Sequence, residues 1–220
     1  RRAQSLDGSV CGRFSSLARE LRVHLLLGSF NETSGDARRC YNTSVLFGPT
    51  GARLAAYRKI HLFDVDLSPE VRFAESDTIL AGEEVVVVPA EPATIGLSIC
   101  FDLRFSWLYG EMRARGAELI TVPSAFTYTT GKDHWHTLLR ARAIETQSFV
   151  LAPAQVGQHD DEGLRESYGH ALIVDPWGSV LADAGETPGV ALAEIDLERV
   201  REVRQALPMR VSPVRKTGDE

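Results

Sequence analysis

The sequence feature that most constrains the fold is an alternation of short apolar runs with amphipathic segments through the middle of the chain. The apolar run 94–99 leads into an amphipathic stretch at 106–115, and the run 119–123 is followed by a helical stretch at 134–146 and a short apolar run at 149–152. Short apolar runs are typical of buried strands, while the longer stretches have the spacing of a helix face. This order predicts an α/β protein.

Hairpins interrupt this alternation on both sides. The extended stretches 43–47 and 53–58 flank the turn sequence Gly-Pro-Thr-Gly at 48–51, and the stretches 171–174 and 179–182 flank Asp-Pro-Trp-Gly. Glycine and proline are favoured in turns, so both segments are predicted to be β-hairpins. A mixture of βα units with hairpins favours layered sheets covered by helices over a purely parallel, doubly wound sheet.

One helix is predicted near each end of the chain. Apolar residues recur at helical spacing over 9–22, and the apolar run 23–30 that follows is predicted to be a buried strand. The acidic segment before Glu84 is predicted to be a loop. A last helix is expected to be capped by Asp196, and the tail after Leu207 is expected to be an arm or a frayed end.

Composition narrows the class of protein further. The chain has 220 residues, of which 44% are hydrophobic, and no linker divides it, so residues 1–220 are predicted to form one domain. A net charge of −6 argues against a nucleic-acid partner. Three cysteines favour a reducing, cytoplasmic location over a disulfide framework. No apolar run approaches the ~20 residues of a membrane span.

Cys100 is the most informative single residue. It follows an apolar strand and precedes a helix, where backbone N–H groups and the helix dipole stabilise a thiolate. A thiolate at such a position is typical of a nucleophile. A buried structural cysteine is an equally good interpretation of the position alone, because free cysteine is among the most buried residue types.

The segments around Cys100 resemble those of a known family. Residues 96–105, GLSICFDLRF, resemble the nucleophile segment of the nitrilase superfamily of carbon-nitrogen hydrolases, in particular its ω-amidase and deaminated-glutathione-amidase branch. Residues 57–64, YRKIHLFD, resemble its lysine segment and residues 73–76, FAES, its second glutamate segment. Further matching segments are 123–126, 134–135, 140–145 and 168–170. The resemblance covers residues 14 to 208.

The resemblance implies a set of catalytic residues. Cys100 would be the nucleophile, and Lys59 would be the cation that stabilises the tetrahedral oxyanion. Glu75 would hold Lys59 or the leaving ammonia, and the backbone N–H of Phe101 would be a second oxyanion donor. Acyl transfer from an amide needs a thiolate, an oxyanion partner and a proton donor for the departing amine. The expected reaction is hydrolysis of a small linear carboxamide through a thioester, with release of ammonia.

The resemblance also bears on the substrate and on partners. Phe101, Phe126, Tyr128 and Arg142 are the predicted substrate-binding residues. The family reaction uses no metal and no cofactor, and its members pair through helices beside the nucleophile strand, so at least a homodimer is expected. Two other functions stay open: a different hydrolase of the superfamily, such as a nitrilase or a carbamoylase, and a non-catalytic scaffold subunit.

Histidines raise the separate question of a metal. His134 and His136 have the spacing that faces one side of a strand, where they could share an ion. The resemblance weighs against this interpretation, because His134 belongs to a segment of the family in which no metal is used. His136 stands where this branch commonly has glutamate, and it is expected to alter pocket charge or substrate choice.

One expected residue has no match in the chain. The family uses another glutamate as general base, at the end of a strand well upstream of the matched segments. Glu20 and Glu32 are the glutamates before Lys59. Glu20 falls within a predicted helix and Glu32 falls on the wrong strand, so neither is assigned. The expected fold is therefore a nitrilase-like α-β-β-α sandwich lacking its first strand-helix-strand segment, and the chain by itself is expected to be nearly inactive.

Overall fold

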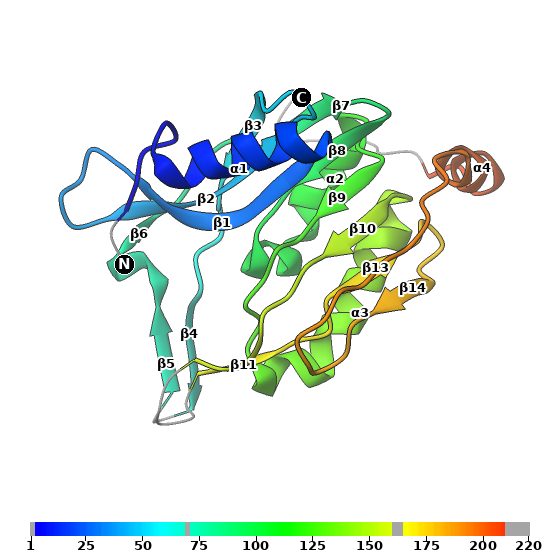
Figure 1. Ribbon diagram of the computed structural model, residues 1–220. Coiled ribbons are helices and arrows are strands. Elements are labelled where there is room, and N and C mark those ends of the chain that lie inside the picture. The colour runs from blue at the N-terminus through cyan, green and yellow to red at the C-terminus, as the bar shows by residue number, and fades with distance from the viewer. Residues whose placement is uncertain (1–2, 69–70, 160–164, 210–220) are drawn as a thin grey trace, which may run out of the picture.

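Two β-sheets face each other, and helices cover both outer sides (Figure 1). The computed structural model describes residues 3–68, 71–159 and 165–209. Helix α1 (Ser9–Leu21) lies over the first sheet, and helices α2 (Ser106–Ala114) and α3 (Tyr128–Thr146) lie over the second. This arrangement confirms the α-β-β-α sandwich expected from the sequence.

The first sheet contains the predicted hairpin. Its order is β1 (Leu25–Thr33), β2 (Cys40–Phe47) and β3 (Arg53–Arg58), all antiparallel, with the short β6 (Ile79–Leu80) parallel to β2. Gly51 closes the hairpin at φ 82°, and a Cβ there would lie 2.7 Å from the carbonyl oxygen of Ser15 in α1. The turn therefore needs glycine both for its backbone angle and for the close approach of the helix.

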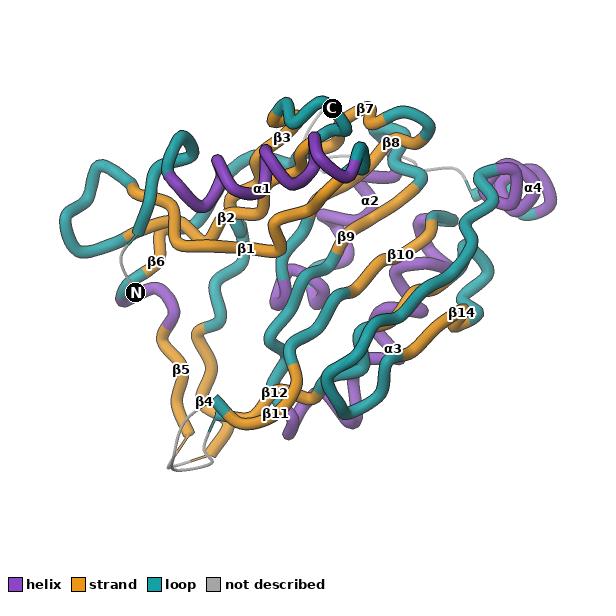
Figure 2. The backbone as a smooth tube through the Cα atoms, in the orientation of Figure 1, coloured by secondary structure: helices purple, strands orange, loops and turns teal. Residues whose placement is uncertain are grey.

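The second sheet contains the predicted βα units. Its order is β14-β13-β10-β9-β8-β7. The bounds are β7 (Val87–Ala90), β8 (Ala93–Leu97), β9 (Leu119–Thr121), β10 (Phe149–Ala152), β13 (Leu172–Val174) and β14 (Val180–Asp183). The central three strands, β8, β9 and β10, are parallel and alternate along the chain with α2 and α3 (Figure 2). The outer strands pair antiparallel, so the sheet is mixed.

Apolar side chains fill each of the three interfaces between layers. Cys11 and Ala18 of α1 pack on Leu27, Val45 and Phe47 of the first sheet. Side chains between the two sheets form a second cluster, made of Leu46, Tyr57, Ala90, Ile95, Leu97 and Ile99. A third and larger cluster lies between the second sheet and helices α2 and α3, and includes Leu108, Tyr109, Met112, Trp135, Leu139, Val150 and Val174. Burial on both faces explains why the strand sequences are continuous apolar runs.

Some elements differ from the sequence-based expectation. The acidic segment predicted to be a loop contains the hairpin of β4 (Asp64–Ser68) and β5 (Val71–Ala74). A further small hairpin joins β11 (Val156–Gln158) and β12 (Glu166–Tyr168). Helix α3 begins at Tyr128, six residues before the expected start. These short elements have little apolar periodicity, so tertiary packing rather than local sequence decides them.

The C-terminal part of the described chain follows the expected order. Asp175 accepts hydrogen bonds from the N–H groups of Trp177 (3.0 Å) and Ser179 (2.7 Å), which fixes the turn between β13 and β14. Helix α4 (Glu198–Ala206) begins after Asp196, whose Oδ1 accepts a hydrogen bond from the N–H of Glu198 at 2.9 Å. The expected arm falls largely on residues 210–220, which lie outside the described residues. No helix within the described ranges is both long and apolar enough to cross a membrane.

Two helical glycines provide a test of the packing around α3. A Cβ at Gly131 would lie 2.4 Å from Cβ of Tyr168, whereas a Cβ at Gly110 of α2 would have no atom within 4 Å. Alanine is the better helix former in both places, by ~1 kcal/mol. Gly131→Ala is expected to lower the free energy of unfolding by about 1–3 kcal/mol because of overpacking, and Gly110→Ala to raise it by about 0.5–1 kcal/mol. Urea denaturation measures both; a stabilising Gly131→Ala would contradict the packing described.

Candidate active site

Cys100 lies at a sharp turn between the second sheet and α2. Strand β8 ends at Leu97, and a 3₁₀ helix, Cys100–Arg104, separates it from α2. The backbone of Cys100 is left-handed, with φ 48°, and its N–H donates to the carbonyl oxygen of Pro123 at 3.0 Å. A non-glycine residue in this conformation is uncommon and costs about 1–3 kcal/mol. The surrounding hydrogen bonds hold the residue there.

Burial dominates the electrostatics of the thiol. Removal from water raises the pKa of the Cys100 thiol above its usual value, while the positive charge of Lys59 and the N–H of Ala125 lower it. The net effect is a raised pKa. The predicted stabilisation of a thiolate by backbone dipoles is therefore present but is outweighed by desolvation. At neutral pH the side chain is a thiol, and it needs a base to become a nucleophile.

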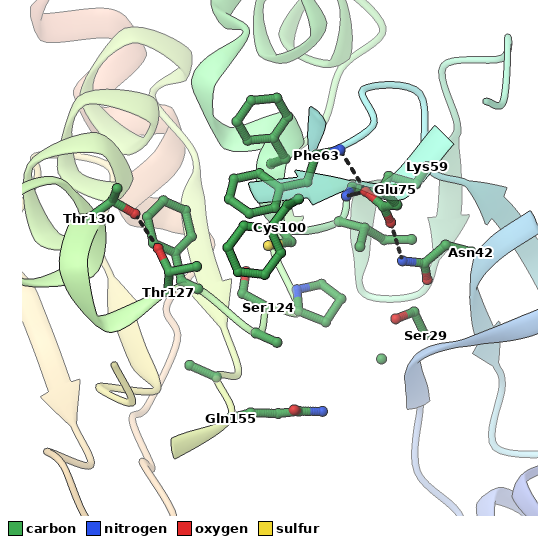
Figure 3. A pocket seen from close by; sticks show the side chains of 18 of the residues that line it. Ser29, Asn42, Lys59, Phe63, Glu75, Cys100, Ser124, Thr127, Thr130 and Gln155 are labelled. Carbon is green, nitrogen blue, oxygen red and sulfur yellow. Dashed lines mark hydrogen bonds and ion pairs between the residues drawn. The ribbon is translucent and has the colours of Figure 1, made fainter. Parts of the chain in front are cut away.

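Lys59 and Glu75 form a largely buried ion pair near Cys100 (Figure 3). The lysine side chain is 3% exposed and the glutamate side chain 19% exposed. The Lys59 ammonium donates a hydrogen bond to Oε2 of Glu75, which also accepts from the N–H of Phe63 at 2.7 Å, and Oε1 accepts from Nδ2 of Asn42 at 3.4 Å. A buried charge is tolerated when it is paired and hydrogen-bonded, as both charges are here.

Neighbouring strands position this pair. Lys59 follows β3 directly, and its N–H donates to the carbonyl oxygen of Asn42 in β2 at 2.9 Å. Glu75 follows β5 and starts a short 3₁₀ turn. The hairpin of β4 and β5 therefore brings Glu75 back to a lysine sixteen residues earlier in the chain. The loop assigned to this segment from the sequence would not have fixed the carboxylate.

Asp102 connects the nucleophile turn to the first sheet. Its carboxylate is fully buried and accepts from the hydroxyl of Tyr57 (2.7 Å), from the N–H of Ile99 (2.9 Å) and from the N–H of His61 (3.0 Å). The ring Nδ1 of His61 lies 2.7 Å from the same carboxylate. These bonds hold the turn that carries Cys100 against the first sheet.

A cavity of about 710 Å³ opens in front of Cys100. Lys59, Glu75 and Cys100 all line it, and so do Phe101 and Phe126. Figure 3 shows Ser29, Ser124, Thr127, Thr130 and Gln155 around the same space. The structure therefore brings the three predicted catalytic residues and two of the four predicted substrate-binding residues to one pocket.

Tyr128 and Arg142 are placed elsewhere, which corrects their assignment to the pocket. Arg142 of α3 is buried; its Nε donates to the carbonyl oxygen of Leu103 at 2.9 Å, and it forms an ion pair with Glu145 at 2.8 Å. Tyr128 packs edge-on against the ring of Tyr168, at 5.7 Å between centroids. Both residues lie on α3, whose inner face contacts the core, so the packing of the helix decides where they point.

The sequence-based interpretation missed the role of Arg104. Its side chain lines the cavity, with its guanidinium 5.0 Å from the ring centre of Phe126 and 5.9 Å from that of Phe101. Burial lowers the pKa of Arg104 from its usual value, yet an arginine remains charged at neutral pH. Arg72 and Arg165 also line the cavity. The signal that was available is the position of Arg104, four residues after the nucleophile on the same turn.

The two upstream glutamates do not line the cavity in front of Cys100. Glu20 is exposed on α1. Glu32 is buried and accepts hydrogen bonds from two guanidinium nitrogens of Arg58, at 2.9 and 2.7 Å, and from the hydroxyl of Thr43 at 2.7 Å. Burial raises the pKa of Glu32, but the bonds from Arg58 and Thr43 outweigh it, so the net pKa is lowered. Glu32 is a structural ion-pair partner, which agrees with leaving it unassigned.

His134 and His136 do not share a strand face, which removes the basis for a shared ion and agrees with the weight given against it. Both lie on α3, where residues two apart point about 200° apart around the axis. His134 contacts Arg104, with 3.3 Å between nitrogens, while His136 contacts Asp183, with Nε2 2.9 Å from Oδ2. His136 is not among the side chains that line the cavity, so it does not alter pocket charge directly, contrary to expectation.

Comparisons with known proteins agree with this arrangement. A profile of the carbon-nitrogen hydrolase family matches residues 1–205. A deaminated glutathione amidase of Synechocystis is 46% identical over 196 residues, covering 88% of this chain and 71% of that protein. The crystal structure of the C. elegans NitFhit protein superposes with a TM-score of 0.85 at 42% identity, covering 92% of this chain and 49% of that one.

A further structure bears on the cysteine. A mutant amidase from Nesterenkonia sp. AN1, described with acrylamide added at the active site cysteine, superposes with a TM-score of 0.71 at 25% identity, covering 90% of this chain and 73% of that one. An α-β-β-α sandwich with a half-buried cysteine beside a lysine–glutamate pair is the arrangement of a nitrilase-like hydrolase. The chain belongs to the carbon-nitrogen hydrolase family of the nitrilase superfamily.

The raised pKa of Cys100 gives a prediction about its reactivity. Alkylation by iodoacetamide requires the thiolate, so the rate at Cys100 is expected to keep rising with pH beyond the usual pKa of a free cysteine. Lys59→Met removes the charge that lowers this pKa, so the rate at pH 7.5 is expected to fall about tenfold. Mass spectrometry of the Cys100 peptide measures the rate separately from Cys11 and Cys40.

The matched control for this experiment is Lys132→Met. Lys132 is an exposed lysine on α3, and its removal is expected to leave the pH profile of Cys100 unchanged. Equal profiles for the Lys59 and Lys132 variants would show that the charge of Lys59 does not reach the thiol.

Proposed function

We propose that the protein is an amidase of the deaminated-glutathione-amidase or ω-amidase type, with Cys100 as nucleophile and Lys59 and Glu75 as its partners. The observation that carries this proposal is the buried Lys59–Glu75 pair in the same cavity as Cys100. Two opposite charges are kept out of water beside a thiol, where an acyl-transfer reaction develops an oxyanion and releases an amine. The substrate is a small linear carboxamide.

The reaction has two stages. The sulfur of Cys100 gives up its proton to a base and attacks the amide carbon, and the Lys59 ammonium and the N–H of Phe101 stabilise the resulting oxyanion. The tetrahedral intermediate collapses when the nitrogen is protonated, which releases ammonia and leaves a thioester. Water then attacks the thioester carbon, giving the free acid and regenerating the thiol. Glu75 holds Lys59 in position throughout.

The proton acceptor for Cys100 comes from outside the described pocket. Among the described residues that line the cavity, Glu75 is the one carboxylate, and its oxygens already accept hydrogen bonds from Lys59, Phe63 and Asn42. Both oxygens of Glu75 are therefore engaged by other donors. The resemblance to the superfamily implies a glutamate base upstream of the matched segments, and we assign the proton transfer to such a residue.

The charge of the cavity favours a substrate with a carboxylate. Arg104 lines it in addition to the paired Lys59, and Arg72, which also lines it, pairs with Asp66 at 3.3 Å. Guanidinium groups bind carboxylates through two parallel hydrogen bonds. Arg104 lies nearest in sequence to the nucleophile, and its planar group is held against two aromatic rings. A substrate with a carboxylate at one end and a carboxamide at the other fits this pocket.

Replacing Arg104 tests the proposed substrate class. Arg104→Gln is expected to raise KM for an amide that carries a carboxylate, such as α-ketoglutaramate, by about 10- to 100-fold, because a charge-assisted hydrogen bond contributes about 1.5–3 kcal/mol. A neutral amide of the same length is the matched control, and its KM is expected to stay unchanged. An equal effect on both substrates would assign Arg104 to the structure of the pocket rather than to the carboxylate.

Ammonia release tests the reaction itself. A protein extended upstream of residue 1 is expected to release ammonia about 10²- to 10⁴-fold faster than the 220-residue chain, because a positioned base contributes that much. In the extended protein, Cys100→Ala is expected to abolish the release, and Glu32→Gln is expected to retain it. Retained activity in Cys100→Ala would refute the nucleophile assignment.

The same assay separates the alternatives. A nitrile and an N-carbamoyl amino acid, offered in parallel with the amide, distinguish a nitrilase or a carbamoylase from an amidase. An extended protein that hydrolyses none of the three, and whose Cys100 alkylates no faster than in the shorter chain, would favour the non-catalytic scaffold.

A further inference from the structure

Three partly exposed side chains from distant segments meet where α3 approaches strands β13 and β14. His136 comes from α3, His170 from the connection between β12 and β13, and Asp183 from the end of β14. The nitrogen and oxygen atoms that these three offer all lie within 4.8 Å of one another. Nε2 of His136 is 2.9 Å from Oδ2 of Asp183, and Nδ1 of His170 is 3.0 Å from both carboxylate oxygens.

Two imidazoles and one carboxylate are a donor set that suits zinc. Zn²⁺ binds histidine nitrogens and carboxylate oxygens at ~2.0–2.1 Å in tetrahedral geometry, which places neighbouring donor atoms roughly 3.3 Å apart. The two histidine–aspartate separations are slightly shorter than this value. The side chains are 34%, 18% and 28% exposed for His136, His170 and Asp183. Small rotations of partly exposed side chains can therefore open the cluster to admit an ion.

The backbone around His170 holds this arrangement in place. His170 has a left-handed backbone, with φ 54°, its N–H donates to the carbonyl oxygen of Gly185 at 2.7 Å, and its carbonyl oxygen accepts from Nε1 of Trp135 at 2.8 Å. Gly185 in turn donates to Oδ1 of Asp183 at 2.8 Å. Nε2 of His170 lies 3.4 Å from a carboxylate oxygen of Glu186. A ligating histidine commonly has such a carboxylate on its second nitrogen, which orients the ring.

We propose that His136, His170 and Asp183 bind a zinc ion, with water at the fourth position. The ion would join α3 to β14 and to the connection before β13, and its role would be to stabilise this side of the sandwich. None of the three residues lines the cavity in front of Cys100. The proposed site is therefore separate from the amide chemistry and is independent of the proposed function.

Zinc titration tests the site directly. The protein is prepared in a Cys100→Ser background, so that the active-site thiol does not compete, and Zn²⁺ binding is measured against a chromophoric chelator. We expect one equivalent to bind and the melting temperature to rise by about 5 °C at saturation, because a ligand that binds the folded state stabilises it. Mg²⁺ is expected to produce no shift, because it prefers oxygen ligands.

Three variants make the test specific. His136→Gln and Asp183→Asn each remove one ligand from a partly exposed position, and both are expected to lose this equivalent and the thermal shift. His134→Gln is the matched control, because His134 lies on the same helix and faces away from the cluster; it is expected to keep both. Circular dichroism checks that each variant is folded.

Two results would overturn the proposal. If the cluster variants bind zinc as the control does, the ion lies elsewhere. If the unaltered cluster binds no zinc, the three side chains form a hydrogen-bonded network only.

Discussion

The buried carboxylate of Asp102 is the interaction on which the arrangement of the site depends. It binds Tyr57 and His61 on one side and the N–H of Ile99 on the other. Lys59 lies between the first two residues in sequence, and Cys100 lies between Ile99 and Asp102 itself. A fully buried carboxylate is stable only when its acceptor positions are filled, so this network sets where the lysine and the thiol stand relative to each other.

Lys59 and Cys100, the two ionisable groups beside this network, differ in what balances their charge. Lys59 has a carboxylate partner in Glu75 and is held as an ion pair. At Cys100, desolvation raises the pKa of the thiol despite the nearby lysine. The site therefore holds Cys100 as a protonated thiol near the Lys59 ammonium, which is charged and positioned to stabilise an oxyanion. The described pocket offers groups that stabilise an oxyanion, but it offers less for removing the proton from Cys100.

Helix α3 contributes residues to two separate regions, the cavity in front of Cys100 and the surface cluster around His136. Its N-terminal turn follows Phe126, whose ring lines the cavity, while His136 reaches β14 on the other side. Trp135, between them, is fully buried and donates to the carbonyl oxygen of His170. Residues that are close in sequence therefore face different places: the pocket, the core and the surface cluster. The geometry of the helix decides which residue faces which.

The sequence by itself determined the order of the main strands and helices, the two turns with glycine, and Cys100, Lys59 and Glu75 as candidates. Each of these depends on local periodicity, turn chemistry or a short contiguous segment. Tertiary structure alone decided that Arg104 faces the cavity, that Arg142 and Tyr128 do not, and that His136 meets His170 and Asp183 rather than His134. Those outcomes depend on which segments pack together although they are far apart in the chain. No local sequence pattern specifies such contacts.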